Sequence, residues 1–435
     1  MSRDPLGIAM ATMSKLASSP IVERMGLRET IERLTYQGTK TGFQALGAAS
    51  RQFKSVTKLI KPERLEAPAL PKNQFDLSIS EEQQMMRDSV GAFAKEVLQP
   101  AAEAQDEAKE TSEEILAQAN ELGLAFFAVP ESLGGAATER SPVTSMLIAE
   151  DLGYGDMGMA VAILSSIGVA NALTQWGTAE QQSKYLNAFV EEKPPHAAIA
   201  TNEKRPLFDP TLLTTTATLE SDGYLLNGEK TLVPMVASAE LFLVAASFNG
   251  KPRIFIVESN SEGLTIDAKP NMGVRAAAMG DIKLNNVKVD ANAMLGGEDF
   301  DYQQFVNLGR LAWCALAVGT AQAVLDYVIP YVNERIAFGE PISHRQSVAF
   351  MVANIGIELN AMRLMTQRAV ALAEHGKPFA REAYLARVFC ADKAMEIGTN
   401  GVQLLGGHGF TKEHPVEHWY RDLRAIAVMD GGLHL

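Results

Sequence analysis

The chain has 435 residues, about three times the length of a typical domain, so we expect two to four domains. Hydrophobic residues make up 47% of it and charged residues 21%, which is the balance of an ordinary globular protein. The net charge of −13 argues against a protein that coats nucleic acid, and we expect no nucleic-acid partner. Two cysteines, Cys314 and Cys390, are too few for a disulfide scaffold or a cysteine-ligated metal site and favour a reducing compartment.

The charge is unevenly distributed along the chain. Residues 1–75 carry twelve Lys and Arg against six Asp and Glu, so this basic segment precedes a strongly acidic remainder. Within 46–61, apolar side chains recur every three or four positions on one face, and basic side chains follow the same spacing on another. This pattern is typical of a helix that lies on an anionic membrane; the alternative is a helix that docks on the acidic remainder of the protein.

Signals for secretion or membrane insertion are weak. The short apolar stretch from Leu6 to Met13 has Asp4 in its basic flank and no clean cleavage site after it, so we expect no signal peptide. The uncharged stretch Leu311 to Leu325 is shorter than the roughly 20 residues that a membrane-spanning helix needs. We interpret it as a buried helix of a bundle.

In chain order, apolar periodicity predicts helices first. A Pro-containing linker at 67–71 precedes a helix from Ser80 to Val97, in which Ser80 and Gln83 form a capping box. Further helices are expected at 112–122, 143–152 and 180–190. We therefore interpret 1–75 as a basic extension with a linker, and 76–197 as an α-helical domain.

Near residue 198 the pattern changes to that of strands. Asp222-Gly223 and Asn227-Gly228 are dipeptides typical of hairpin turns. The clearest hairpin joins 241–248 to 253–258 through Asn249-Gly250. These features predict a middle antiparallel, β-barrel-like domain over 198–298.

From residue 299 to the end the pattern is helical again. Long helices are predicted at 302–332, 347–375 and 381–405, and their short connections indicate an antiparallel bundle. The predicted fold class is therefore α+β and multidomain, with a helical domain, a β domain and a helical bundle at 299–435.

Most common catalytic motifs are absent from the sequence. It contains no G-x-G-x-x-G after a strand, no Walker loop, no H-E-x-x-H and no G-x-S-x-G. The histidines do not fall at metal-ligand spacing, although His408, His414 and His418 come nearest to a cluster, so we expect no metal.

Two segments could contact a phosphate-bearing ligand. One is the Gly-rich end of a helix at 403–410, and the other is 333–342, which places Arg335 in the turn after a long helix. A plain helix stop and a surface ion pair are the simpler explanations of these two segments.

These segments, in this order, resemble the acyl-CoA dehydrogenase family from about residue 78 to the end. The matching positions are 80–83, 129–131, 134–135, 177–181, 226–231, 272–275, 335–341, 403–410, 415–417 and 421–422. Members of this family have a helical domain, a middle β domain and a C-terminal four-helix bundle, with FAD bound between them. The resemblance therefore implies FAD as the cofactor and a homodimer or homotetramer, because an Arg in this family contacts FAD across a subunit interface.

The resemblance also implies roles for individual residues. Arg335 matches the Arg that contacts the FAD pyrophosphate, and Asp430 stands where the family has its catalytic Glu. The implied cofactor-binding residues are Arg335, Phe338, Gln346, Gln403, Gly406, Gly407 and Thr201. The implied substrate-binding residues are Arg310 and Asp209.

The segments around the expected reaction centre diverge from the family pattern. Asp430 is one methylene shorter than Glu, and a misplacement near 1 Å can lower a rate about a hundredfold. The segment from Thr201 to Asp209 has lost the family's glycines and Ser. Pro234 replaces a Thr and has neither the hydroxyl nor the N–H that would serve flavin N5. The chain also ends where the family continues with a helix, so the bundle is expected to be short or truncated.

The resemblance implies an FAD-dependent acyl-CoA dehydrogenase that oxidises a medium- to long-chain fatty acyl-CoA in fatty acid β-oxidation, with electron-transfer flavoprotein or a similar acceptor. Two alternatives remain open: a catalytically degenerate scaffold that binds acyl-CoA and FAD, and a nitroalkane-oxidase-like flavoenzyme that uses Asp430. We expect a cytoplasmic location in a bacterium or the mitochondrial matrix in a eukaryote, with peripheral contact to the inner membrane through 46–61.

Overall fold

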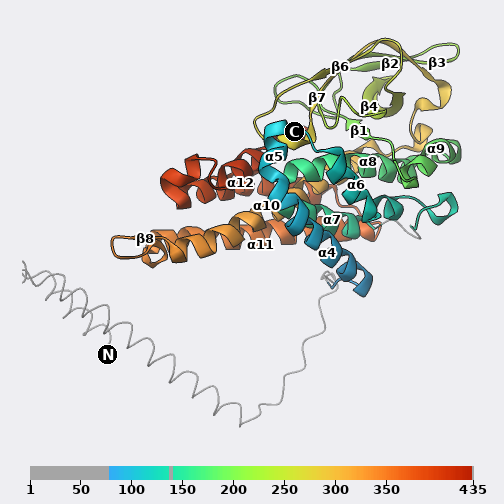
Figure 1. Ribbon diagram of the computed structural model, residues 1–435. Coiled ribbons are helices and arrows are strands. Elements are labelled where there is room, and N and C mark those ends of the chain that lie inside the picture. The colour runs from blue at the N-terminus through green and yellow to red at the C-terminus, as the bar shows by residue number, and fades with distance from the viewer. Residues whose placement is uncertain (1–77, 137–140, 434–435) are drawn as a thin grey trace, which may run out of the picture. The chain divides into compact units, whose positions relative to one another are not determined.

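The computed structural model describes residues 78–136 and 141–433. The predicted amphipathic segment 46–61 and the linker at 67–71 lie outside the described residues. In chain order, helices are followed by a sheet and then by long helices (Figure 1). The predicted fold class is therefore confirmed.

The first helical part begins at the predicted capping box. The Ser80 hydroxyl accepts a hydrogen bond from the Gln83 amide at 3.1 Å, and the Gln83 side chain accepts one from the Ser80 amide at 2.9 Å. A short π-helical segment, Ala94–Leu98, joins the first two helices. The helices of this part are α4 (Glu81–Phe93), α5 (Gln99–Ala108), α6 (Glu113–Glu121), α7 (Pro142–Gly155), α8 (Met157–Trp176) and α9 (Ala179–Tyr185).

Helix α8 was not predicted from the sequence. Apolar residues surround it on all sides, so the sequence shows no amphipathic period, and its residues are buried around most of the circumference. The Asp156 carboxylate caps the helix by accepting from the Met159 amide at 2.7 Å. Because α8 lies inside the fold, it provides walls for cavities rather than an outer surface.

The middle part is a seven-stranded sheet in which β4 lies at a branch and pairs with three strands. The predicted hairpin is confirmed as β4 and β5, with Leu241 opposite Glu258. The sheet is mixed rather than purely antiparallel, because β1 and β2 run parallel to β4. The strands are β1 (Ala197–Ala200), β2 (Thr216–Leu219), β3 (Gly223–Val233), β4 (Leu241–Phe248), β5 (Lys251–Glu258), β6 (Leu264–Ala268) and β7 (Gly280–Asp290).

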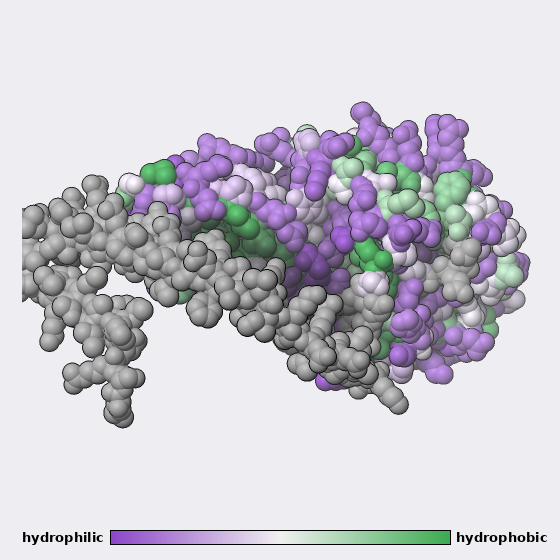
Figure 2. All heavy atoms as spheres, turned by 90° about the horizontal axis from the view of Figure 1, so that it is seen from below, coloured by the Kyte–Doolittle hydropathy of each residue, from purple (hydrophilic) through white to green (hydrophobic). Residues whose placement is uncertain are grey.

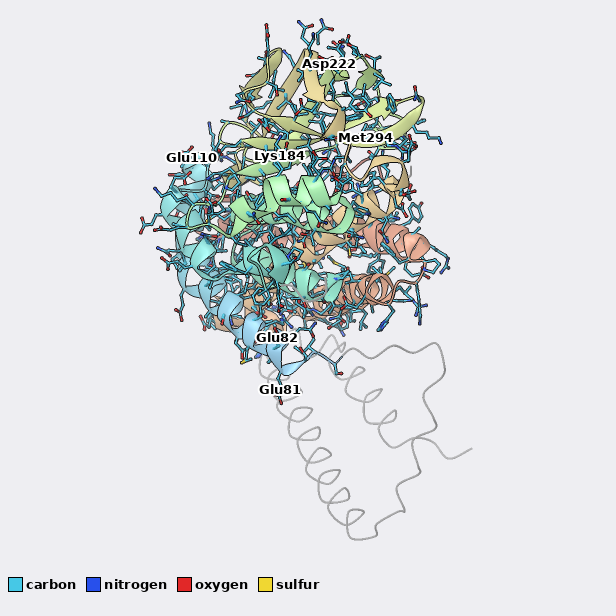
Figure 3. All side chains as sticks on the ribbon, turned by 90° about the vertical axis from the view of Figure 1, so that its right-hand side faces the viewer. Glu81, Glu82, Glu110, Lys184, Asp222 and Met294 are labelled. Carbon is cyan, nitrogen blue, oxygen red and sulfur yellow. The ribbon has the colours of Figure 1, made fainter. Side chains whose placement is uncertain are left out.

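One of the three predicted hairpin turns is wrong. Asp222-Gly223 joins β2 to β3, as expected, and Figure 3 shows Asp222 at the far end of the sheet from Glu81 and Glu82 of α4. Asn227-Gly228, however, lies inside β3 at a shift of register against β7. Gly228 has φ of 151°, and a Cβ there would lie 2.6 Å from Thr215, so the glycine serves a bulge rather than a hairpin turn.

The last part contains the three predicted long helices, each within two residues of the predicted ends. They are α10 (Tyr302–Glu334), α11 (Gln346–Glu374) and α12 (Ala380–Leu405), and α13 (Val416–Leu423) follows them. A two-stranded ribbon of β8 (Ile336–Ala337) and β9 (Glu340–Pro341) joins α10 to α11. Leu311 to Leu325 lies within α10 and is mostly buried, as predicted.

Helix α11 differs from the other long helices in its exposure. By length and composition alone, α8, α10 and α11 could each cross a membrane, but the most apolar stretch of α11 is only 17% buried against 67% in the other two. Phe350, Ile357 and Leu364 are seven residues apart and all more than half exposed. Figure 2 views the protein from the side on which α11 lies in Figure 1, and hydrophobic patches interrupt the hydrophilic surface there.

Candidate active site

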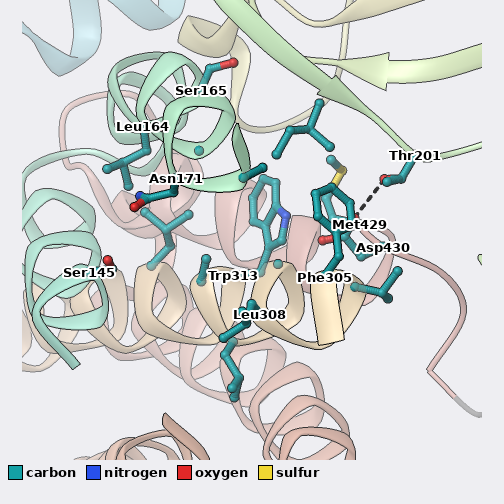
Figure 4. A pocket seen from close by; sticks show the side chains of 18 of the residues that line it. Ser145, Leu164, Ser165, Asn171, Thr201, Phe305, Leu308, Trp313, Met429 and Asp430 are labelled. Atoms are coloured by element: carbon teal, nitrogen blue, oxygen red, sulfur yellow. Dashed lines mark hydrogen bonds between the residues drawn. The ribbon is translucent and has the colours of Figure 1, made fainter. Parts of the chain in front are cut away.

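Asp430, the predicted catalytic base, lies in a tight loop that follows α13 and a short 3₁₀ turn. Its backbone φ is 54°, and the φ of Gly431 is 103°, so the chain reverses through two left-handed positions. One carboxylate oxygen of Asp430 accepts a hydrogen bond from the Thr201 hydroxyl at 2.9 Å (Figure 4). The loop thus brings together two predicted site residues that are 229 positions apart.

Helix α10 leaves room for this carboxylate at Gly309. A Cβ on Gly309 would lie 2.9 Å from Oδ2 of Asp430, closer than real Cβ atoms approach other atoms. The missing side chain therefore allows the short aspartate to lie directly against the helix.

Two arginines fix the loop through its backbone. Arg310 Nε donates to the carbonyl of Asp430 at 3.1 Å, and Arg387 Nη2 donates to the carbonyls of Met429 and Gly431. Arg387 is 1% exposed, and burial lowers its pKa, an effect that the negative charge of Asp430 partly offsets. Three successive carbonyls are therefore held by buried guanidinium groups, while the carboxylate itself is left beside the cavity.

A cavity of about 240 Å³ opens in front of Asp430. Its walls come mainly from α7, α8 and α10, and most of the lining side chains are apolar. Figure 4 shows Trp313 in the middle of this cavity, with Asn171 on one side and Asp430 on the other. A neighbouring cavity of about 340 Å³ adjoins it and shares five of its lining residues: Ser145, Leu164, Gly168, Asn171 and Ala312.

The β domain closes the cavity at the Asp430 end. Leu232 and Pro234, in the segment that the resemblance assigns to the flavin ring, line the same cavity as Asp430. Asn202 is 4% exposed, and its Oδ1 has no hydrogen-bond partner among the described residues. Since a buried unpaired acceptor costs about 1–3 kcal/mol, this oxygen fits a ring N–H of a bound flavin.

A buried ion pair supports this end of the β domain. Lys230 on β3 is fully buried, and its Nζ lies 2.9 Å from Glu203 Oε1. Burial raises the pKa of Glu203, but Lys230 and hydrogen bonds from Thr214 and Thr215 outweigh it and lower the pKa to about 2. Burial lowers the pKa of Lys230 to about 8, against the opposing effect of Glu203. The pair ties the segment after β1 to β3 and so holds Thr201 in place.

Most of the predicted cofactor residues lie on the surface and do not line the Asp430 cavity. Arg335 is exposed and has no ion pair among the residues that the structure describes. Phe338 is 95% exposed. The remaining exposed members of this group are Gln346, Gln403, Gly406 and Gly407.

The two predicted substrate residues lie beside the cavity rather than on its walls. Arg310 is 5% exposed and holds the Asp430 backbone from behind. The Asp209 carboxylate accepts from the amide and hydroxyl of Thr211, which makes a local turn. Their roles toward substrate stay predictions, and the structure adds a positioning role for Arg310.

A second buried charged cluster lies at the junction of α5, α8 and α13. His418 Nε2 is 3.1 Å from Asp156 Oδ2 and 3.2 Å from Asp422 Oδ2, while Asp106 pairs with Arg275 and Arg421. Burial alone would lower the pKa of His418, but the two adjacent carboxylates outweigh it and raise the pKa to about 11.

The three carboxylates and three cations of this cluster balance. The atoms of Asp156, His418 and Asp422 are close enough to hold a metal ion, but the raised pKa indicates that His418 carries a proton instead. His408 and His414 lie elsewhere, in an exposed group with Glu413, so the structure separates His418 from the other two histidines of the weak sequence cluster.

Several residues of the site were missed by sequence reasoning. Asn202, Gly309, Arg387, Asn171 and Trp313 become significant only through contacts between distant segments. Helix α8 also carries Ser165, Ser166, Thr174 and Gln175, so its sequence does not single out Asn171.

Known protein families match almost the whole of the chain from residue 80 onward. Models of the acyl-CoA dehydrogenase N-terminal, middle and C-terminal domains match residues 80–193, 198–287 and 301–433. The Bacillus subtilis protein named "Probable acyl-CoA dehydrogenase YngJ" is 32% identical over 82% of this chain and 96% of its own length. The mitochondrial short/branched chain specific acyl-CoA dehydrogenase of Rattus norvegicus is 31% identical over 81% of this chain and 83% of its own.

A solved structure agrees with these matches. Butyryl-CoA dehydrogenase from Megasphaera elsdenii superposes with a TM-score of 0.76 at 27% identity, covering 82% of this chain and 97% of that one. The chain belongs to the acyl-CoA dehydrogenase family, and the resemblance in its sequence is confirmed. It is accordingly a flavoprotein of the oxidoreductase class, with FAD as its cofactor.

Proposed function

We propose that the protein oxidises the Cα–Cβ bond of a medium- to long-chain acyl-CoA thioester, as in fatty acid β-oxidation, with Asp430 as the base. The observation that carries this proposal is the Asp430 carboxylate at one end of an apolar cavity, with Thr201 as its hydrogen-bond donor. An acyl chain fits the apolar walls, and a carboxylate at their end is placed to take a proton from the carbon next to the thioester carbonyl.

The residues of this chain divide the work of the reaction between them. Asp430 takes the α-proton on its carboxylate, and Arg310 and Arg387 keep its backbone in position. Leu232, Pro234 and Asn202 form the wall that would hold the flavin ring. FAD, when bound, supplies the acceptor for the hydride that leaves Cβ. The apolar side chains of α8 and α10 exclude water from the reacting carbons.

The length of the cavity supports a medium or longer chain. Its lining residues on α8 extend from Val161 to Trp176, which is about 22 Å along the helix axis. A second cavity of about 340 Å³ adjoins this space. The names of the rat relative and of the Megasphaera structure specify short or branched substrates, so a graded series of acyl-CoAs is needed to test this point.

We further propose that the protein is a homo-oligomer and passes its electrons to an electron-transfer flavoprotein or similar acceptor. The exposed apolar residues of α11 support an interface with a second copy. Arg335 and Phe338 lie on the surface away from the Asp430 cavity, which suits residues that contact the FAD of a neighbouring subunit. One solved neighbour, 28% identical with a TM-score of 0.76, comes from work on an electron transferring flavoprotein of Acidaminococcus fermentans.

The decisive experiment is anaerobic titration of the purified full chain with acyl-CoAs of four to sixteen carbons, followed by the flavin absorbance. Bleaching by these thioesters, lost in Asp430→Asn, supports the proposal. Bleaching only by nitroalkanes would replace it with the nitroalkane-oxidase-like alternative. Absence of bound flavin after reconstitution with FAD would favour the scaffold.

A further inference from the structure

Two polar groups inside the apolar cavity have no partner. Asn171 on α8 lines both adjoining cavities, and no hydrogen bond to its side-chain amide is found within residues 78–136 and 141–433. Trp313 on α10 is 9% exposed, and its indole N–H likewise has no acceptor among the described residues. Tryptophan N–H groups and amides in such surroundings ordinarily find partners, so these two stand out.

The other polar side chains of the cavity are accounted for. Thr201 donates to Asp430 at 2.9 Å, and Ser165 donates to the Ala197 carbonyl at 2.7 Å. Ser145 donates to the Ser141 carbonyl at 3.2 Å. Asn202 lines the end of the cavity formed by Leu232 and Pro234. Asn171 and Trp313 are therefore the groups left for whatever occupies the acyl part of the cavity.

Their positions lie along the path of an acyl chain. Figure 4 shows the Trp313 indole between Asp430 and Asn171, so a chain leaving Asp430 meets Trp313 first and Asn171 after it. Beyond Asn171 the second cavity has a polar wall, where Gln83 donates to Thr144 at 3.0 Å and Ser141 to Glu374 at 3.0 Å. The environment thus becomes more polar with distance from the reacting carbons.

A plain alkyl chain is a poor match for this arrangement. It would cover an amide and an indole N–H without bonding to either, and a polar group buried without a partner lowers the affinity. A hydroxyl or carbonyl oxygen on the chain would accept from Trp313 or Asn171 and remove that cost. Sites built around a substrate hydrogen bond discriminate strongly against analogues that lack it.

We propose that the physiological substrate is an acyl thioester whose tail carries a hydroxyl or carbonyl oxygen, recognised by the Asn171 amide and the Trp313 N–H. This inference rests on the proposed acyl-CoA dehydrogenase function and specifies its substrate class. The oxygen lies on the tail, away from the carbons that Asp430 and the flavin act upon.

The test compares octanoyl-CoA with its 5-, 6- and 7-hydroxy derivatives. Binding is measured by calorimetry on the FAD-loaded Asp430→Asn protein, which holds the thioester without turning it over, and kcat/KM is measured on the unmodified enzyme. At least one hydroxy derivative is expected to bind about tenfold more tightly than octanoyl-CoA and to have the higher kcat/KM. The calorimetric measurement does not require turnover, so it tests recognition of the tail even if the enzyme is inactive.

Two variants assign the effect to the named residues. Asn171→Leu keeps the volume and removes the amide, and Trp313→Phe keeps an aromatic ring and removes the N–H. Either variant is expected to reduce the preference for the hydroxy chain severalfold while octanoyl-CoA binding stays the same or improves. Leu164→Met, which changes an apolar residue of both cavities, is the matched control and is expected to leave the ratio of the two affinities unaltered.

The outcomes separate this inference from the proposed function. Octanoyl-CoA binding as tightly as all three derivatives, with normal flavin bleaching, would overturn the inference and leave the function standing. A preference that persists in both variants would remove the assignment to Asn171 and Trp313. If neither substrate bleaches the flavin, the proposed function fails, whereas the binding ratio still decides the recognition of the tail.

Discussion

Two regions of the protein bury carboxylates in opposite ways. In the cluster around His418, each of Asp106, Asp156 and Asp422 lies next to a cationic side chain, and the charges cancel. At Asp430 the nearby arginines bind the backbone carbonyls, and the carboxylate accepts a hydroxyl hydrogen bond. The comparison teaches that a carboxylate compensated on all sides holds domains together, whereas one with its charge left open beside a cavity is available to accept a proton.

The largest expected effect concerns the base itself. Asp430→Asn keeps the size of the side chain and the Thr201 contact but removes the ability to take a proton. Loss of a positioned base costs typically 10²–10⁴-fold, so kcat with the best acyl-CoA is expected to fall about a thousandfold. The denaturation midpoint should stay close to that of the unmodified protein. A residual rate above a tenth would show that another group removes the proton.

Removing the charge of His418 from the second cluster is expected to lower the stability of the protein rather than its activity. His418→Leu leaves Asp156 and Asp422 buried without their cation, and breaking such a pair costs about 3 kcal/mol. Urea denaturation should therefore show a lower unfolding free energy, with kcat of the folded fraction within about twofold of the unmodified value. The exposed His375→Leu provides the control, which should change neither quantity. If His418→Leu lost activity and kept its stability, the two regions would not differ in the way proposed.

A smaller effect is expected from closing the space beside Asp430. Gly309→Ala places a Cβ 2.9 Å from Oδ2, so the carboxylate must shift, and kcat is expected to fall about 10- to 100-fold. Gly356→Ala on α11 adds the same atom with only an ordinary contact at 3.8 Å and serves as its control. Equal rates in the two variants would mean that the carboxylate does not use this space during turnover.

The smallest expected effect is the change of the unfolding free energy with each pH unit. His418 has a folded pKa of about 11 against 6.5 for the free side chain, so the folded protein holds a proton that the unfolded chain releases in between. Its stabilising contribution is complete below pH 6.5 and is lost as the pH rises toward 11, at about 1.4 kcal/mol per pH unit. Lys230, with a lowered pKa of about 8, opposes this trend above pH 8.

The window between pH 6.5 and 8 therefore isolates His418. The unfolding free energy should fall across it in the unmodified protein, and the slope should be nearly absent in His418→Gln. A slope that survives in the variant would assign the dependence to other groups.

The sequence predicted the fold where a pattern is local. The ends of α10, α11 and α12 were predicted to within two residues, and the capping box of α4 followed from two residues. Helix α8 was missed because it is apolar on all sides, and periodicity carries no signal in that case. Asn227-Gly228 was assigned to a turn because a bulge and a hairpin place the same demand on glycine, and only the partner strand distinguishes them.

The residues of the candidate site also fall into those that the sequence predicted and those that only the structure shows. Asp430 and Thr201 were found through the resemblance to a family, and the structure brings them within hydrogen-bond distance. Arg387, the positioning role of Arg310, the gap at Gly309 and the cluster around His418 were not found. Each depends on residues from separate elements meeting in space, for which one chain's sequence holds no local pattern.

The hydrogen bonds from Arg310 and Arg387 to the carbonyls of residues 429–431, the clamp on this loop, restrict its motion. Catalytic loops are usually among the first segments to open, but this loop cannot open without exposing the Arg310 and Arg387 guanidiniums and releasing three carbonyls at once. Its neighbour Gly432 also donates its amide to the Phe208 carbonyl at 2.8 Å. The Gly432 amide should therefore exchange its hydrogen for deuterium about as slowly as the core of the bundle. If Asp430 is the base, as proposed, this clamp would hold it nearly rigid, and adaptation to the substrate would fall to the helices that line the cavity.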